Sequence, residues 1–240
     1  MSANHAAFNL IFRFVENYIS PIAGRISSQR HVMAIRDGFI SAMPFMIVGS
    51  FLLVFAYPPF SPDTTWGFAR AWLDLAKEFE GRILTPFDMT MGIMSIYICA
   101  AISYNLGKHY EKSNQLDPFM CAMLSIMAFL LIAAPKTNGT LPVDSLGGTG
   151  IFTAILVAIY CVEMMRFLKA HNIGIRLPDQ VPPMIKNSFD LLIPVLVVVL
   201  TLYPLSLFIQ HHFDMLIPQA IMAIFKPLVS AADSLPAILL

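Results

Sequence analysis

Residues 191–210 read LLIPVLVVVLTLYPLSLFIQ, an apolar run that contains no Asp, Glu, Lys or Arg. A helix of about 20 such residues is long enough to cross the ~30 Å hydrocarbon core of a bilayer. In lipid the backbone N–H and C=O groups must be satisfied within the segment itself. The run therefore predicts a transmembrane helix.

Four more charge-free runs of similar length precede it: Gly38–Pro62, Met89–Gly107, Pro118–Pro135 and Ser145–Val162. Hydrophobic residues make up 57% of the 240 residues and charged residues only 12%, against about 25% charged in an ordinary soluble domain. We predict an all-α, polytopic membrane protein with about five transmembrane helices, and we exclude a soluble enzyme. The net charge of zero gives no indication of nucleic-acid binding.

Three amphipathic segments lie outside these runs: Phe8–Ile26, Trp66–Leu84 and Phe213–Leu235. The first predicts a helix in the cytoplasmic interface, ended or bent by Pro21, or a helix packed on its own domain. The second predicts a helix in the outer interface, or one packed under a loop. The third predicts an interfacial helix broken at Pro218 and Pro227, with a sixth, tilted span as the alternative. The last residues, Leu235–Leu240, look like the start of a further apolar segment that has been cut.

The loops alternate in basic content. Ten of the 15 Lys and Arg residues lie before the first run or in the loops after the second and fourth runs. Because cytoplasmic loops carry an excess of Lys and Arg, this predicts a cytoplasmic N-terminus.

Few ionisable residues lie within or beside the runs. Glu163 and Arg166 are three residues apart and are expected to pair along one helix face as a structural anchor. Asp88 precedes the second run, where we expect it to cap a helix N-terminus. Lys186 and Asp190 frame the start of the fifth run and are spaced for an i,i+4 pair.

The chain offers no pattern typical of a metal site, a cofactor or a nucleotide loop, and we predict none. The cysteines, Cys99, Cys121 and Cys161, fall in three different runs and are expected to act as small packing residues. The six histidines all fall in loops or at the ends of runs, so none is placed for a proton relay at the membrane midplane.

Three stretches resemble a known family. They are 31–45 (HVMAIRDGFISAMPF), 91–107 (MGIMSIY followed by AAISYNLG) and 175–194 (IRLPDQVPP followed by SF and LIP). These are similar to the enzyme IIC membrane permeases of bacterial sugar phosphotransferase systems, of the lactose/cellobiose/diacetylchitobiose type. Gln180 departs from the small residue usual in that loop. Family members are also nearly twice as long, so the resemblance covers only their N-terminal half.

The resemblance implies three segments: a cytoplasmic amphipathic segment (1–30), a five-span domain of the dimerisation type (31–210), and a linker with the truncated start of the next span (211–240). It implies a homodimer in the bacterial cell membrane that takes up a β-linked disaccharide: cellobiose, diacetylchitobiose or lactose. A separate IIB protein, supplied by IIA, would phosphorylate the sugar. The family's sugar-binding His and Glu motifs would follow Leu240, so no catalytic or substrate-binding residue is assigned here.

The basic loop that contains Arg176, Asp179 and Lys186 would face the IIB protein. Its charge predicts either a docking surface or the positive-inside signal alone. Two rival functions remain at this point. One is a short membrane scaffold or regulatory protein without transport activity, and the other is a small ion channel or an unrelated secondary transporter.

Overall fold

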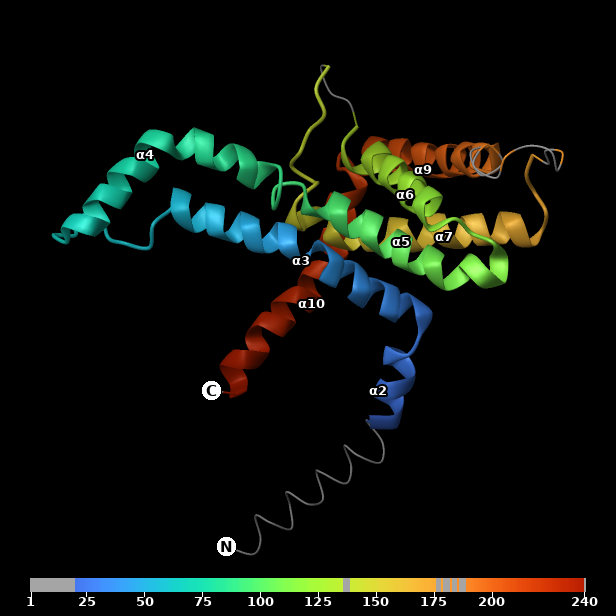
Figure 1. Ribbon diagram of the computed structural model, residues 1–240, viewed down its shortest axis with the longest axis horizontal. Helices are drawn as coiled ribbons and strands as arrows, with labels where there is room; N and C mark the ends of the chain where they lie inside the picture. Colours follow the sequence, from blue (N-terminus) through green and yellow to red (C-terminus); the bar gives the residue numbers. More distant parts are fainter. Residues whose placement is uncertain are drawn as a thin grey trace, which may run out of the picture.

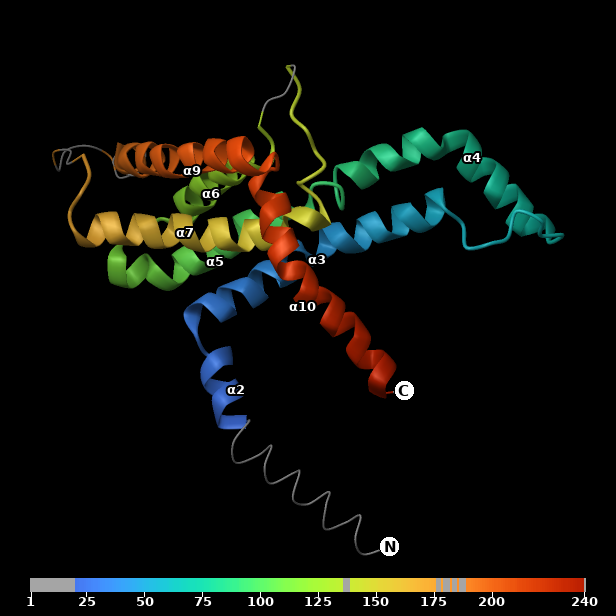
Figure 2. The same ribbon diagram turned by 180° about the vertical axis from the view of Figure 1, so that it is seen from behind.

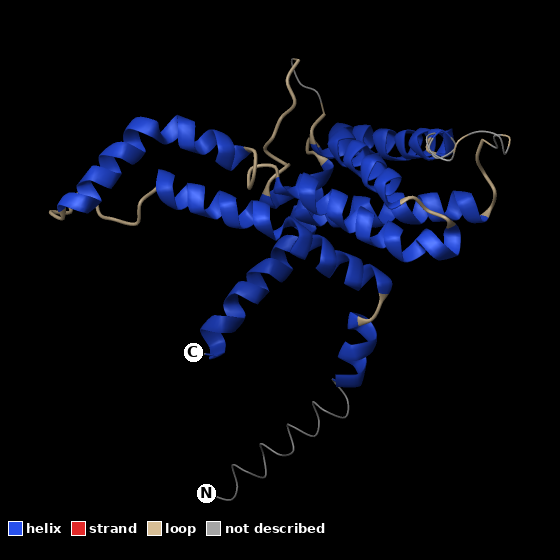
Figure 3. Cartoon of the chain, in the orientation of Figure 1, coloured by secondary structure: helices blue, strands red, loops and turns tan. Residues whose placement is uncertain are grey.

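A computed structural model describes residues 20–135, 139–175 and 189–239, together with Pro178, Pro182 and Ile185. The described residues form helices joined by loops (Figure 3). The α-helices of this part are α2 (Ser20–Ser27), α3 (Arg30–Ala56), α4 (Gly67–Asp88), α5 (Met94–Asn114), α6 (Pro118–Ala133), α7 (Ile151–Ala170), α9 (Leu192–Phe213) and α10 (Ile217–Leu239), with a 3₁₀ turn, η2 (Gly148–Gly150). The all-α class predicted from the sequence is confirmed.

The core forms around α5, which packs against α3, α6 and α7 (Figure 1). Ile102 of α5, Phe129 of α6 and Val162 of α7 are fully buried there. Small residues bring the helix backbones close together: a Cβ atom added at Gly38 of α3 would overlap Ile102. In lipid, where the hydrophobic effect does not hold helices together, such close van der Waals packing stabilises their association.

The helices α3 and α4 form a hairpin that extends away from the other helices (Figure 1). Helix α3 has 27 residues, which corresponds to about 40 Å. Helix α4 returns beside it and buries Ala69 and Ala76. Trp72 fixes the tip by donating a hydrogen bond from Nε1 to the carbonyl oxygen of Phe55, at 3.2 Å. The predicted Trp66–Leu84 helix is thus present as α4, and it packs on α3.

Figures 1 and 2 show that α2 and α10 leave the body on the same side. Helix α10 is anchored by Phe225, whose ring stacks on Phe152 of α7 with the centroids 4.4 Å apart. The prediction that Pro218 and Pro227 break this segment is wrong, because α10 is one continuous helix. Pro218 lies in its first turn, where no intrahelical N–H bond is required. Of the predicted amphipathic segment at the N-terminus, residues 8–19 lie outside the described residues.

Three of the five predicted spans fall on helices that are long and apolar enough to cross a membrane. These helices are α3, α7 extended by η2, and α9. The third run falls on α6, a shorter apolar helix of 16 residues. The second falls on α5, which has 21 residues and a polar last turn. The described part of the chain therefore has the helical content of a polytopic membrane protein.

The boundary before α5 differs from the prediction. Asp88 is the last residue of α4, so the expected role at a helix N-terminus is wrong. Residues 89–93 form a turn, and α5 begins at Met94. Gly92 allows this turn, because a Cβ atom there would lie 2.7 Å from the Cα atom of Asp88.

Candidate functional site

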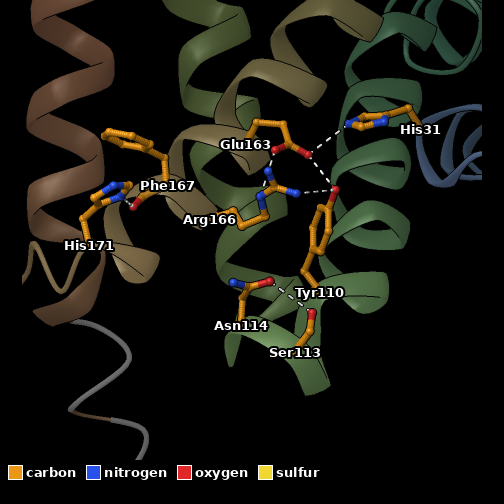
Figure 4. A network of polar contacts seen from close by, with 8 residues as sticks. All are labelled: His31, Tyr110, Ser113, Asn114, Glu163, Arg166, Phe167 and His171. Carbon is orange, nitrogen blue, oxygen red and sulfur yellow. Dashed lines mark hydrogen bonds and ion pairs between the residues drawn. The ribbon is translucent and has the colours of Figure 1, made fainter.

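Polar side chains from three helices meet where α5 and α7 end and α3 begins. Glu163 and Arg166 lie one turn apart on α7, Tyr110 lies in the polar last part of α5, and His31 lies in the first turn of α3. Figure 4 shows these four side chains pointing toward one another. We call them the polar cluster.

Glu163 is the centre of the cluster. Its Oε1 accepts hydrogen bonds from the Tyr110 hydroxyl at 2.8 Å and pairs with His31 Nε2 at 2.9 Å. Its Oε2 pairs with Nε of Arg166 at 3.0 Å, which confirms the predicted i,i+3 pair. Arg166 in turn donates from Nη1 to the Tyr110 oxygen at 3.1 Å. All four side chains are thus joined in one network (Figure 4).

Tyr110 is the buried member, with 2% of its surface exposed. Burial raises the pKa of its hydroxyl, and the hydrogen bond to Glu163 raises it further. The phenol therefore stays protonated and keeps its role as donor. The guanidinium carbons of Arg166 and Arg30 lie 4.9 and 5.5 Å from the Tyr110 ring centroid, within range of a cation–π interaction.

Both carboxylate oxygens of Glu163 are occupied by donors, so this geometry offers no free general base. Its effect is mechanical: it fixes the start of α3 to the ends of α5 and α7. The sequence indicated only the Glu163–Arg166 pair. His31 and Tyr110 were missed because they lie 132 and 53 positions from Glu163, and no local pattern reports such separations.

A second polar feature lies beside the cluster. Lys169 pairs with Asp190 at 3.4 Å and donates to the carbonyl oxygen of Gln115 at 2.7 Å. The expected partner of Asp190 was Lys186, which lies outside the described residues. A cavity of about 600 Å³ opens here, with Asn114 and Asn172 also in its wall.

The three residues predicted for a docking loop, Arg176, Asp179 and Lys186, all lie outside the part of the chain that the structure describes. Their prediction stays a prediction. The cysteines, Cys99, Cys121 and Cys161, are buried and free, and all three belong to the packed core as predicted. Among the described residues, no three His, Cys, Asp or Glu side chains are grouped so that they could hold a metal ion.

Comparison with known proteins places this chain in a family. Residues 36–240 match the family described as Phosphotransferase system, EIIC. The cellobiose-specific EIIC component of Geobacillus stearothermophilus is 35% identical over 206 residues, which are 78% of this chain and 43% of that protein. The lactose-specific EIICB component of Streptococcus mutans serotype c is 33% identical over 219 residues, 89% of this chain and 37% of that protein.

A solved structure shows the same fold. It is the transporter ChbC, the IIC component from the N,N'-diacetylchitobiose-specific phosphotransferase system. The TM-score is 0.75 at 31% sequence identity, and the alignment covers 91% of this chain and 52% of ChbC. The chain thus spans about half, or less, of the length of the relatives it matches.

Proposed function

Because the chain belongs to the EIIC family of the phosphotransferase system, in its lactose/cellobiose/chitobiose branch, we propose that it is the N-terminal half of a permease for a β-linked disaccharide. The observation that carries the proposal is the match over residues 36–240. The similar proteins named above are specific for cellobiose, lactose and diacetylchitobiose. The substrate of this chain would be one of these three sugars.

In the proposed mechanism, the complete permease takes the disaccharide from outside and presents a hydroxyl group toward the cytoplasm. A IIB protein, charged by IIA, transfers a phosphoryl group to that hydroxyl. The phosphate adds negative charge, which keeps the product from crossing back through hydrocarbon. The permease needs no phosphate-carrying residue of its own for this reaction, and residues 1–240 would contribute scaffold and not the sugar site.

The proposal can be tested with a chimera in which this chain replaces the matching N-terminal segment of the cellobiose-specific permease of Geobacillus stearothermophilus. We expect uptake of radiolabelled cellobiose that depends on IIB. Purified residues 1–240 alone should show no saturable binding of cellobiose, lactose or diacetylchitobiose. A chimera that inserts and folds but transports nothing would contradict the permease role. Saturable binding by the isolated chain would contradict the assignment of the sugar site to a later segment.

We propose that the end of the bundle with the polar cluster faces the cytoplasm and the IIB protein. The described basic residues of this end include Arg25, Arg30, Lys108 and Lys112, as the positive-inside rule requires. The background for cysteine labelling is low, because the native cysteines are buried. A Ser113→Cys variant should react with a membrane-impermeant maleimide only from the cytoplasmic side, and Ser61→Cys only from outside. The reverse pattern would overturn the orientation.

We also propose a homodimer in the membrane. In the most apolar 18-residue stretch of α3, and in that of α9, only 17% is buried within one protomer, against 44% in the corresponding stretch of α7. Phe51 of α3 and Leu200 of α9 are 65% and 62% exposed, so both helices offer an apolar face to lipid or to a second copy. Sedimentation of the detergent-solubilised chain should give a dimer. A single protomer at high concentration would refute the homodimer.

A further inference from the structure

We infer that Arg30 forms a binding site for the phosphate group of an anionic phospholipid, at the end of the molecule where the polar cluster lies. The inference does not depend on which sugar is transported, or on whether this chain transports at all. It rests on the charge balance around the cluster, on the way Tyr110 holds the guanidinium group, and on the apolar surface of α3.

Arg30 carries a charge that no ion pair among the described residues balances. The carboxylates that form ion pairs at this end are bound by other cations. Glu163 pairs with His31 and Arg166, Asp37 with Arg36, and Asp190 with Lys169. Arg30 itself is exposed. An exposed guanidinium group without a carboxylate partner is available to an external anion.

The Arg30 side chain is nevertheless held in place. Its guanidinium carbon lies 5.5 Å from the Tyr110 ring centroid. That ring is fixed by burial and by the hydrogen bonds that link its hydroxyl to Glu163 and Arg166. A cation held over a ring face keeps its charge, and a guanidinium group has five N–H donors to offer. Because the fold already orders this side chain, binding an oxyanion requires little further loss of its conformational entropy.

The helix terminus adds to the attraction. Arg30 is the first residue of α3, and Gln29 before it makes no side-chain cap hydrogen bond. The first N–H groups of a helix have no intrahelical acceptor, and together they favour a negative charge at that end. The backbone and the guanidinium group thus act on an anion in the same region.

The apolar surface that follows Arg30 favours a lipid over a free phosphate ion. Ile40, Met43 and Ile47 recur at steps of three and four along α3, and they are 53%, 48% and 51% exposed. These steps place the three side chains on one face of the helix. A phospholipid can set its phosphate near Arg30 and its acyl chains along α3, whereas inorganic phosphate gains only the electrostatic part. The ligand class is a phosphodiester with acyl chains and a net negative charge, such as phosphatidylglycerol.

The test measures lipid binding to the detergent-purified 240-residue chain by native mass spectrometry and by thermal melting. Three additions are compared: phosphatidylglycerol, phosphatidylcholine and inorganic phosphate. The variant is Arg30→Gln, which removes the charge. Arg82→Gln is the matched control, because Arg82 also lies over an aromatic ring, that of Phe79, at 5.6 Å. It lies on α4, away from the polar cluster.

We expect phosphatidylglycerol to bind and to raise the melting temperature of the native chain and of Arg82→Gln. In Arg30→Gln its dissociation constant should rise about fivefold, as expected for the loss of one basic residue near an anionic lipid surface. Arg30→Lys keeps the charge but loses the planar guanidinium group. Its dissociation constant for phosphatidylglycerol should lie between those of the native chain and of Arg30→Gln. Equal lipid affinity in Arg30→Gln and the native chain would overturn the proposal. So would equal stabilisation by phosphatidylcholine, or the full effect from inorganic phosphate alone.

Discussion

Helices α7 and α3 are both long and apolar enough to cross a membrane, yet they use their apolar residues differently. The most apolar 18-residue stretch of α7 is 44% buried in the protomer, and that of α3 is only 17% buried. Helix α7 packs against α5, α6 and α9, whereas much of α3 reaches out with α4 as a hairpin (Figure 1). Apolar content thus indicates that a helix lies in lipid. Small residues and polar contacts decide which other helices it packs against.

The largest effect should separate the core from the outer face of α3. Phe129 is fully buried in α6, and Phe51 of α3 is 65% exposed. We expect Phe129→Ala to lower the free energy of unfolding in detergent by about 3–5 kcal/mol, because it leaves a cavity. Within a single protomer, Phe51→Ala should change it by less than about 0.5 kcal/mol. Chemical denaturation curves measure both, and a large loss in Phe51→Ala would show that a second protomer covers this face.

The second comparison concerns glycines in the hairpin. A Cβ atom at Gly38 would lie 2.9 Å from the backbone nitrogen of Ile102, and nothing lies within 4 Å of a Cβ at Gly81 of α4. Gly38→Ala should therefore destabilise the fold by about 1–3 kcal/mol, since α3 must move from α5. Gly81→Ala should stabilise it by about 0.5–1 kcal/mol through helix propensity. Equal melting temperatures of the two variants would argue against the close α3–α5 contact.

A third, smaller difference should appear between two glutamates. Glu163 accepts from three side chains in the polar cluster, and Glu80 accepts from Tyr57 in the exposed hairpin. Glu163→Gln should cost about 1 kcal/mol, a value reduced because the Glu163 side chain is 28% exposed. Glu80→Gln should leave the melting temperature unchanged. If both variants melt like the native chain, the cluster does not fix α3 to the bundle.

These comparisons also explain what could be predicted from the sequence. The charge-free run 191–210 located α9 (Leu192–Phe213) closely, because lipid forbids unpaired backbone groups and charges along a span. The run Ser145–Val162 falls on α7, but it begins and ends several residues before that helix (Ile151–Ala170), which continues past Glu163 and Arg166. The start of α3 was missed: the helix begins at Arg30, eight residues before Gly38, since His31 and Arg36 make polar contacts in its first turns. The start of α5 was missed because the turn at Gly92 depends on a close backbone approach. The polar cluster could be predicted only as the local pair on α7.

The finest comparison is between Tyr57, the residue that follows the end of α3, and Tyr110, in the polar last part of α5. The pKa of Tyr110 is raised mainly by burial, and that of Tyr57 mainly by its hydrogen bond to Glu80. Glu80→Gln should therefore return the Tyr57 pKa close to its usual value of about 10, while Glu163→Gln leaves the Tyr110 pKa raised. Absorbance at 295 nm during alkaline titration measures both, with Tyr57→Phe and Tyr110→Phe to isolate each signal by difference.

The sign of the accompanying stability change follows from linkage. A phenol whose pKa is higher in the folded state stabilises the fold at every pH below its unfolded pKa. That contribution is lost as the pH rises through the folded pKa. Because the pKa values of both tyrosines are raised above the usual value, neither phenol changes its protonation near neutral pH, and the stability there does not depend on pH through them. Alkaline unfolding should begin at the polar cluster, because an ionised Tyr110 would face Glu163 across a 2.8 Å hydrogen bond that has lost its proton. If Tyr110→Phe unfolds at the same alkaline pH as the native chain, ionisation of Tyr110 is not what opens the cluster.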